Sequence, residues 1–188
     1  MELVSEAVIF AVQAHDGMRR KKSESPYILH PMEAAVIVGT MTTDQHLIAA
    51  AALHDVVEDA GVSIEEIEAR FGKRVRELVA SETEDKRADL PPESTWRVRK
   101  EESLTVLKNA KDIGVLMVWL GDKLANMRSI YRDFKVEGEA MWQRFNQKNV
   151  AEQAWYYRSI VKLTERLSDT SAWLEYKTLT ELVFKEEV

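Results

Sequence analysis

The sequence predicts an all-α protein that forms one domain over residues 1–188. Apolar residues recur at helical spacing along most of the chain, and no stretch shows the alternation and hairpin turns of β-strands. The seven glycines and four prolines fall between the segments of helical period. With 45% hydrophobic residues, a chain of this length can bury a real core. We therefore expect a bundle of about eight or more helices.

The first three helices follow from apolar spacing and from capping residues. Residues 2–16 place apolar side chains on one stripe, after which the polar segment RRKKSESPY breaks the pattern. Pro31 is suited to the first turn of a helix over 31–38. Asp44 can cap the next helix, which we expect over 45–59.

The remaining helices are predicted in the same way. Ser63 and Glu66 form a capping box at the start of a helix that ends near Gly72. Further helices are expected over 73–84, 95–109, 112–133, 139–166 and 171–186, with a polar loop over 85–94.

Composition and charge exclude several classes of protein. The absence of cysteine excludes disulfide scaffolds, zinc knuckles, iron–sulfur clusters and thiol catalysis. A net charge of -6 is unfavourable for a generic nucleic-acid binder. No apolar run approaches the roughly 18 residues that span a membrane, and the first residues lack the basic start of a signal peptide. We expect a cytoplasmic protein without nucleic-acid or membrane partners, and a homo-oligomer is compatible with this sequence.

The segment AAALHDVVEDAG gathers four titratable residues. Residues four apart share a helix face, so His54 and Asp55 would lie beside Glu58 and Asp59. Acids at a helix C-terminus are disfavoured by the helix dipole, and a bound metal ion would remove that cost. Taken alone, the segment is equally compatible with a solvated acidic helix end.

Two further residues complete a candidate metal site. His30 lies at a loop-to-helix junction in PYILHP, and Asp122 follows the apolar run GVLMVWLG. A buried carboxylate must be paired or coordinate a metal, and a salt bridge to Arg128 or Arg132 is the alternative for Asp122. Two imidazoles and two carboxylates suit Mn²⁺, and imidazole also suits Zn²⁺, Fe²⁺ or Ni²⁺. The candidate ligands are His30, His54, Asp55 and Asp122.

The order His, His-Asp, Asp resembles that of the HD-domain metal-dependent phosphohydrolases. The similarity is closest to the single-domain small alarmone hydrolases among the RelA/SpoT homologues. It is carried by RKKSESPYILHP, HDVVED, FGKRVRELV, GDKLANMRSI and WQRFNQKNVAEQAWYYRSI. The resemblance implies an HD-type domain that uses Mn²⁺ to cleave the 3′-pyrophosphate of (p)ppGpp or (p)ppApp. The products would be pyrophosphate and GDP or GTP, or ADP or ATP.

The resemblance also implies residue roles. Glu58 and Asp59 match the pair that orients or deprotonates the attacking water. Arg20 and Lys21 match an Arg-Lys pair that contacts the nucleotide, and Asn126 matches an Asn that contacts the ribose or base. Weaker candidates for substrate contacts are Arg128, Lys86, Arg144 and Lys148.

Departures from the family pattern leave the substrate open. Met18 and Ala125 replace polar residues of many relatives, and Trp96 stands where some have a phosphate-binding Lys. One alternative is an HD phosphohydrolase that acts on the 2′-phosphate of NADPH or on a nucleoside monophosphate. Another is a nucleotide sensor without turnover, although such a sensor would have no need of Glu58 and Asp59.

Overall fold

The computed structural model confirms the all-α class. It describes residues 1–20, 24–87 and 89–185, and within these ranges the chain forms helices and no strand. One isolated antiparallel bridge, between Arg19 and Pro26, closes the loop after the first helix. None of the helices in the described ranges is both long enough and apolar enough to cross a membrane.

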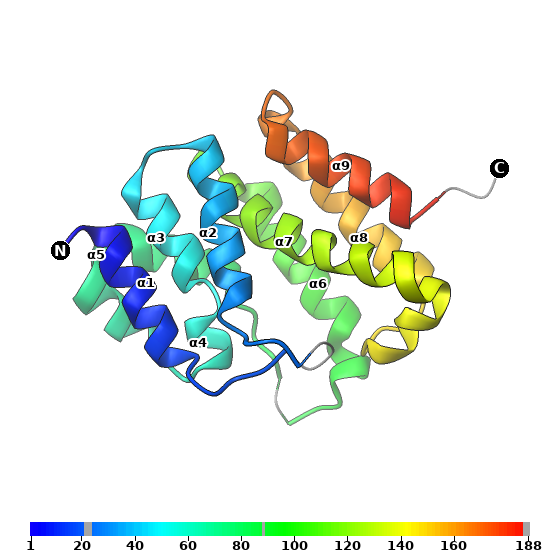
Figure 1. Cartoon of the computed structure of the whole chain (residues 1–188), viewed down its shortest axis with the longest axis horizontal. Helices are drawn as coiled ribbons and strands as arrows, with labels where there is room; N and C mark the ends of the chain where they lie inside the picture. Colours follow the sequence, from blue (N-terminus) through cyan, green and yellow to red (C-terminus); the bar gives the residue numbers. More distant parts are fainter. Residues whose placement is uncertain (21–23, 88, 186–188) are drawn as a thin grey trace.

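The helices surround one long central helix, α7 (Figure 1). α7 packs against α2 on one side and against α9 on the other, while α3 contacts α1, α2 and α5. In chain order the elements are α1 (Leu3–Ala14), α2 (Leu29–Met41), α3 (Gln45–Leu53), α4 (Val56–Asp59), α5 (Ile64–Glu82), α6 (Pro92–Asn109), α7 (Ile113–Glu137), η1 (Gly138–Arg144), α8 (Val150–Leu163), η2 (Glu165–Leu167) and α9 (Ser171–Val183).

Two of the predicted caps are confirmed. The Asp44 carboxylate accepts a hydrogen bond from the His46 backbone N–H at 2.9 Å, at the start of α3. The Ser63 hydroxyl accepts one from the Glu66 backbone N–H at 3.1 Å, at the start of α5. Each side chain satisfies a backbone donor that the first helical turn leaves free.

The predicted helix over 45–59 is wrong in its second half. α3 ends at Leu53, His54 and Asp55 form a turn, and α4 is a separate short helix. The cause is local, because His54 Nδ1 donates to the Ala51 carbonyl at 2.7 Å. A continuing helix would use that acceptor for its own backbone bond. The four titratable groups therefore do not share one helical face, and Asp55 instead precedes α4.

The predicted break at Gly72 is confirmed, because α5 consists of two helical segments that meet at a kink where Gly72 has a non-helical φ of 83°. One other boundary differs from the prediction. The helix expected over 139–166 is interrupted after η1, because the Asn149 side chain caps a new helix, α8, by accepting from the Ala151 N–H at 2.9 Å. The other predicted helices match α1, α2, α6, α7 and α9 apart from their ends, and residue 186 lies outside the described residues.

The hydrophobic core consists of two clusters that meet at α2 and α7. One cluster joins α6, α8 and α9 and includes the fully buried Trp119 and Trp142. The other joins α1, α3 and α5 and includes Leu53 and Leu78. Because α2 and α7 contribute side chains to both clusters, the contact between these helices fixes the two halves of the molecule relative to each other.

α2 and α7 cross at Gly121, where the two backbones come into close contact. A Cβ atom at this position would lie 2.6 Å from Val38 Cγ2 and 3.0 Å from the Ala34 carbonyl oxygen. These distances are too short for a side chain, so glycine is required for this crossing. The crossing places Asp122, the next residue, beside the N-terminal turn of α2.

We predict that Gly121→Ala destabilises the protein by about 1–3 kcal/mol, because the added methyl overpacks the crossing. Gly39→Ala is the matched control in α2, since its Cβ would meet only Ile48 Cδ1 at 3.9 Å. That control should be neutral, or more stable by up to about 1 kcal/mol, through higher helix propensity. Urea unfolding of both variants measures the difference, and equal stability would contradict the close crossing.

Candidate functional site

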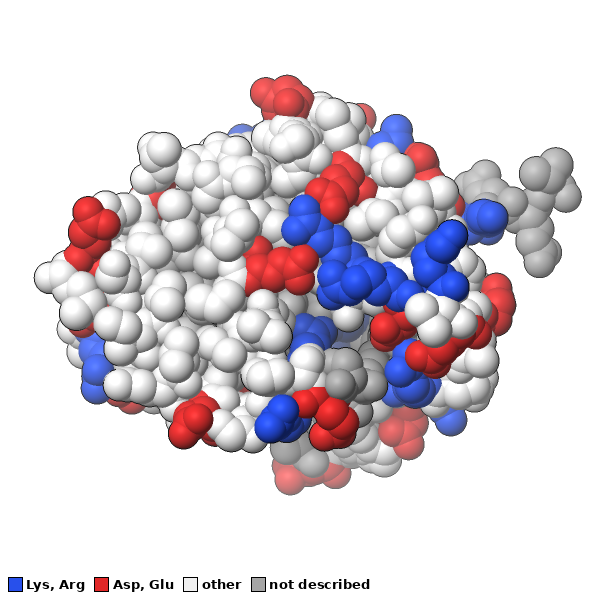
Figure 2. Space-filling model, in the orientation of Figure 1, with Lys and Arg blue, Asp and Glu red and all other residues white. Residues whose placement is uncertain are grey.

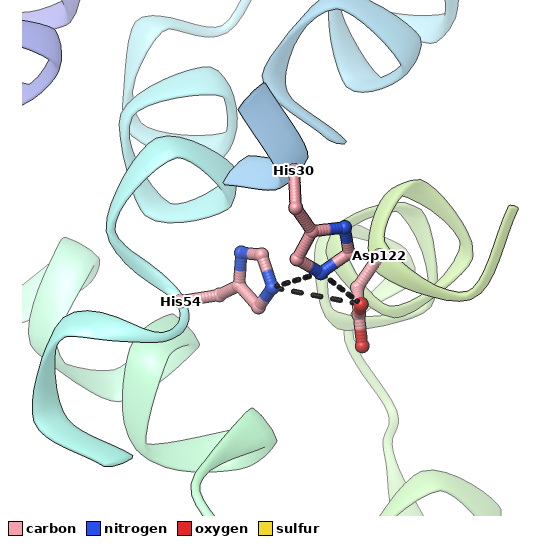
Figure 3. Close-up of side chains that lie close together, drawn as sticks. All are labelled: His30, His54 and Asp122. Atoms are coloured by element: carbon pink, nitrogen blue, oxygen red, sulfur yellow. Dashed lines mark hydrogen bonds and ion pairs between the residues drawn. The ribbon is translucent and has the colours of Figure 1, made fainter. Parts of the chain in front are cut away.

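Three buried side chains from distant parts of the chain converge at the α2–α7 crossing (Figure 3). His30 Nε2 lies 3.0 Å from Asp122 Oδ1 and 3.3 Å from His54 Nε2, and His54 Nε2 lies 3.5 Å from Asp122 Oδ1. His30 comes from the first turn of α2, His54 from the end of α3 and Asp122 from α7. The exposed fraction of each residue is 6% or less.

The fourth predicted ligand lies beside this cluster. Asp55 Oδ2 is 3.2 Å from His54 Nε2 and 3.5 Å from His30 Nε2. The structure thus brings His30, His54, Asp55 and Asp122 together, as the sequence predicts.

The donor set fits a divalent cation. His54 Nδ1 donates to the Ala51 carbonyl, so the neutral ring presents an unprotonated Nε2 to the cluster. The Nε2 atoms of His30 and His54 lie 3.3 Å apart, and Asp122 Oδ1 lies beside both. One divalent cation can bind all three atoms at once, whereas one proton cannot. The backbone bond of His54 is the kind of outer contact that orients a metal-binding histidine.

Charges of opposite sign stabilise one another in the cluster. Burial raises the pKa of Asp122, but Lys123 and His54 outweigh that effect and hold the pKa well below its usual value. Burial lowers the pKa of His54, but Asp55 and Asp122 outweigh it and raise the pKa well above its usual value. A divalent cation would take the place of the proton that these carboxylates favour on His54.

The polar partners of Asp122 are not the arginines that the sequence analysis considered as an alternative. Lys123 Nζ donates to Asp122 Oδ2, and Asn126 Nδ2 donates to Asp122 Oδ1 at 2.6 Å. Neither Arg128 nor Arg132 pairs with this carboxylate among the ion pairs found in the described ranges.

The predicted catalytic pair borders the cluster. Glu58 Oε2 accepts from the Glu84 backbone N–H at 3.3 Å, and burial raises the pKa of Glu58. Asp59 is bound on both sides, since Oδ2 accepts from the Tyr27 hydroxyl at 2.6 Å and Oδ1 accepts from Lys86 Nζ at 2.5 Å. Lys86 therefore lies against both acids, and its predicted phosphate contact stays a prediction.

Tyr27 is a site residue that the sequence analysis did not assign. Its hydroxyl lies 2.8 Å from Asp55 Oδ2 and 2.6 Å from Asp59 Oδ2. A hydroxyl has one proton, so it can donate to only one of these carboxylates at a time. The ring stacks on His15 with centroids 5.0 Å apart. The signal available in the sequence was its place in PYILHP, three residues before His30.

Two cavities meet beside the cluster. The smaller one, about 190 Å³, is lined by the four predicted ligands together with Glu58 and Asp59, and we call it the metal cavity. The larger one, about 400 Å³, has aromatic walls, and we call it the aromatic cavity. Its aromatic lining residues are Tyr27, Trp96, Phe145, Tyr156 and Tyr157.

A group of residues that we call the junction lines both cavities. Three of its members are cations, so positive side chains lie between the two cavities although the chain is acidic overall. The junction residues are Arg20, Tyr27, Asp59, Lys100, Lys123 and Asn126.

The predicted substrate-binding residues lie in different parts of the structure, and only some of them line the cavities. Arg20 and Asn126 lie together at the junction, where Arg20 Nη2 donates to Asn126 Oδ1 at 3.0 Å. Lys21 lies outside the described residues. Arg128 forms ion pairs with Glu33 of α2 and Glu175 of α9. Figure 2 shows Lys and Arg side chains gathered on one part of the surface. Arg144 pairs with Asp133, and neither Arg144 nor Lys148 lines a cavity described here.

The sequence analysis also missed the buried Glu82 and two partly buried lysines of the junction, Lys100 and Lys123. Lys100 Nζ donates to Glu84 at 2.5 Å, Lys123 lies beside Asp122, and Glu82 faces Lys123 at 3.7 Å. No spacing rule distinguishes them from surface charges, because contacts between helices remove them from solvent.

Comparison with known proteins identifies the class. The HD domain model matches residues 7–149 of this chain. The guanosine-3′,5′-bis(diphosphate) 3′-pyrophosphohydrolase MESH1 of Xenopus tropicalis is 40% identical over 133 residues, which cover 69% of this chain and 70% of that protein. The chain therefore belongs to the HD-domain family.

Within that family, some relatives are named 3′-pyrophosphohydrolases, while the Brucella relatives, 35–36% identical over 128 residues, are named GTP pyrophosphokinases. The guanosine-3′,5′-bis(diphosphate) 3′-pyrophosphohydrolase of Aquifex aeolicus is 35% identical over 130 residues, 69% of this chain and 18% of that protein. The chain thus spans less than a fifth of the length of the bacterial relatives it matches. A solved metazoan ortholog of SpoT, described as hydrolysing ppGpp, has a TM-score of 0.75 and 26% identity, with 97% of this chain and 96% of that chain covered.

We predict that chelator-treated protein takes up one divalent ion per chain and becomes more stable. At a free ion concentration of 100 times the dissociation constant, the gain would be about 2.7 kcal/mol. Asp122→Asn should lose both the ion and the gain, whereas Asp169→Asn, an exposed control, should keep both. Elemental analysis and thermal unfolding provide the readouts. Full metal content in Asp122→Asn would contradict a ligand role.

Proposed function

We propose that this protein is a Mn²⁺-dependent hydrolase that removes the 3′-pyrophosphate of guanosine alarmones such as ppGpp. One observation carries the proposal: the cluster of His30, His54, Asp55 and Asp122 opens, through a junction with three cations, into an aromatic cavity of nucleotide size. The similarity to the 3′-pyrophosphohydrolases of Xenopus tropicalis and Aquifex aeolicus supports the same substrate. We further propose that residues 1–188 act as one HD-type domain, since α7 contributes to both hydrophobic clusters.

The proposed ligands suit a hard-to-borderline divalent ion. Two imidazoles and two carboxylates without thiolates favour Mn²⁺ or a similar ion. When bound, such an ion lowers the pKa of a coordinated water toward about 7 and so makes hydroxide available. His30 and His54 would bind it through Nε2, and Asp122 through the Oδ1 atom that faces both rings.

Glu58 is the better placed of the two acids to move a proton. Burial raises its pKa toward the operating range of a general base. Both acids face Lys86, at 3.3 Å from Glu58 Oε1 and 2.5 Å from Asp59 Oδ1, but Asp59 also accepts from the Tyr27 hydroxyl at 2.6 Å. We propose that Glu58 takes the proton of the attacking water, and that Asp59 orients this water or the 3′-oxygen that leaves.

The junction and the aromatic cavity fit the rest of the substrate. Water attacks the phosphorus bound to the ribose 3′-oxygen, the P–O bond to that oxygen breaks, and the oxygen is protonated as pyrophosphate departs. Negative charge develops on the phosphoryl oxygens, where Arg20 and Lys100 can stabilise it. The aromatic side chains provide flat surfaces for the base, and the guanidinium of Arg20 can also stack on a purine.

The direct test is product analysis of Mn²⁺-loaded protein given ppGpp, pppGpp, ppApp and NADPH in parallel. We expect pyrophosphate and GDP from ppGpp. Glu58→Gln should reduce kcat by at least about 100-fold while it keeps the metal. Intact ppGpp beside an active reference hydrolase would overturn the proposal. Phosphate from NADPH alone would indicate a different HD phosphohydrolase, and no turnover of any of the four would indicate a nucleotide sensor.

Tyr27→Phe should lower kcat for ppGpp by about tenfold, because it removes a hydrogen bond to charged Asp55 and Asp59 and keeps the ring. KM should change little, since the variant keeps the ring that lines the aromatic cavity. Tyr131→Phe, in α7 outside both cavity linings, is the control. Steady-state kinetics of both variants decide, and equal kcat values would show that the hydroxyl does not position the acids.

A further inference from the structure

Lys123 lies between the two cavities, and the series of proposed metal ligands and catalytic acids gives it no role. It follows Asp122 on α7, its side chain is 13% exposed, and it lines both the metal cavity and the aromatic cavity. A group that extends from the aromatic cavity to the proposed metal would cross the junction to which this ammonium belongs.

The surroundings of Lys123 hold its ammonium on three sides. Nζ donates to Asp122 Oδ2, lies 4.9 Å from the centre of the Trp119 ring, and lies 3.7 Å from Glu82 Oε2. The Trp119 ring is itself fixed, because its Nε1 donates to the Ser81 carbonyl at 3.2 Å. The remaining side faces the cavities.

Glu82 is an unusual counter-charge. Its side chain is 2% exposed, and neither carboxylate oxygen has a hydrogen-bond partner among the described residues. A buried carboxylate without hydrogen bonds is costly, and burial raises the pKa of Glu82 to about 8 although Lys123 lowers it, so Glu82 attracts Lys123 most strongly above that pH. The distance of 3.7 Å to Lys123 is too long for a hydrogen bond but close enough for strong attraction at low dielectric.

Among the described residues, this arrangement leaves hydrogen-bond donors free on Lys123. An ammonium has three N–H groups, of which one is used by Asp122. The other junction cations also donate one side-chain hydrogen bond each within the described ranges, Lys100 to Glu84 at 2.5 Å and Arg20 to Asn126 at 3.0 Å, but of the three only Lys123 is bonded to the proposed metal ligand Asp122. Asp122 presents Oδ1 to the histidines and Oδ2 to Lys123, so the lysine can remain in place when Oδ1 binds a metal.

We propose that Lys123 is a further substrate-binding residue, whose ammonium binds the 3′-pyrophosphate between the metal and the nucleotide, and that Glu82 is a positioning residue for that ammonium. The inference rests on the proposed function for the identity of the substrate. Glu82 attracts Lys123 without occupying its donors, which keeps the cation at the junction and free to bind phosphate oxygens.

Titration calorimetry of inorganic pyrophosphate into Mn²⁺-loaded protein tests this assignment without turnover. Lys123→Met should weaken pyrophosphate binding by about tenfold or more, because a charge-assisted contact is lost. Lys123→Arg should stay within about threefold of the native affinity, since it keeps the positive charge. Lys135→Met, an exposed control in the last turn of α7, should stay within about twofold, as expected for a surface charge outside the site. Native affinity in Lys123→Met, or loss of the metal in parallel with affinity, would overturn the binding role.

A double-mutant cycle separates positioning from general stability. Glu82→Gln should weaken pyrophosphate binding by about three- to tenfold in the native background and cause no further loss in Lys123→Met. Equal losses in both backgrounds, or no loss in folded Glu82→Gln, would overturn the positioning role. If Lys123→Met does not fold, Lys123→Gln, which can still donate to Asp122, replaces it in both tests.

The outcomes also separate this inference from the proposed function. If Lys123→Met binds pyrophosphate more weakly but the native protein leaves ppGpp intact, the proposed substrate is wrong and the phosphate-binding role of Lys123 stands. If the native protein cleaves ppGpp but Lys123→Met binds pyrophosphate with native affinity, the proposed function stands and the role of Lys123 is wrong.

Discussion

Asp122 carries a buried carboxylate at the centre of the molecule, and the groups around it are arranged to compensate its charge. Oδ1 faces His30, His54 and the Asn126 amide, while Oδ2 faces Lys123. Burial of such a charge requires partners of this kind. The carboxylate reaches this position only because α2 and α7 touch at the preceding glycine. The close helix crossing and the candidate metal site are therefore parts of the same feature.

The same helix links the proposed chemistry to substrate binding. From Asp122, one turn along α7 leads to Asn126, which accepts a hydrogen bond from Arg20 at the junction. Lys123 lines the cavities on both sides. A single rigid element thus carries residues for the metal, the phosphate groups and the nucleotide. Side chains on a helix hold such geometry more accurately than side chains on loops.

Sequence patterns predicted the helical class and the residues that gather at the metal site, because both depend on local spacing and recognisable motifs. They failed where a side chain competes with the backbone, as at His54, which ends α3 by taking the Ala51 carbonyl. They also failed where burial comes from contacts between distant helices. Glu82 and Lys123 belong to α5 and α7, and nothing in either segment alone shows that these charges face each other in the interior.

The central claim is that the cluster around Asp122 holds one divalent ion for hydrolysis at the junction. Anomalous diffraction from crystals of Mn²⁺-loaded protein tests it most directly. The account predicts one strong peak within about 2.0–2.3 Å of His30 Nε2, His54 Nε2 and Asp122 Oδ1, with Asp55 as a further ligand. A peak elsewhere, or no peak at this cluster at saturating Mn²⁺, would contradict the account.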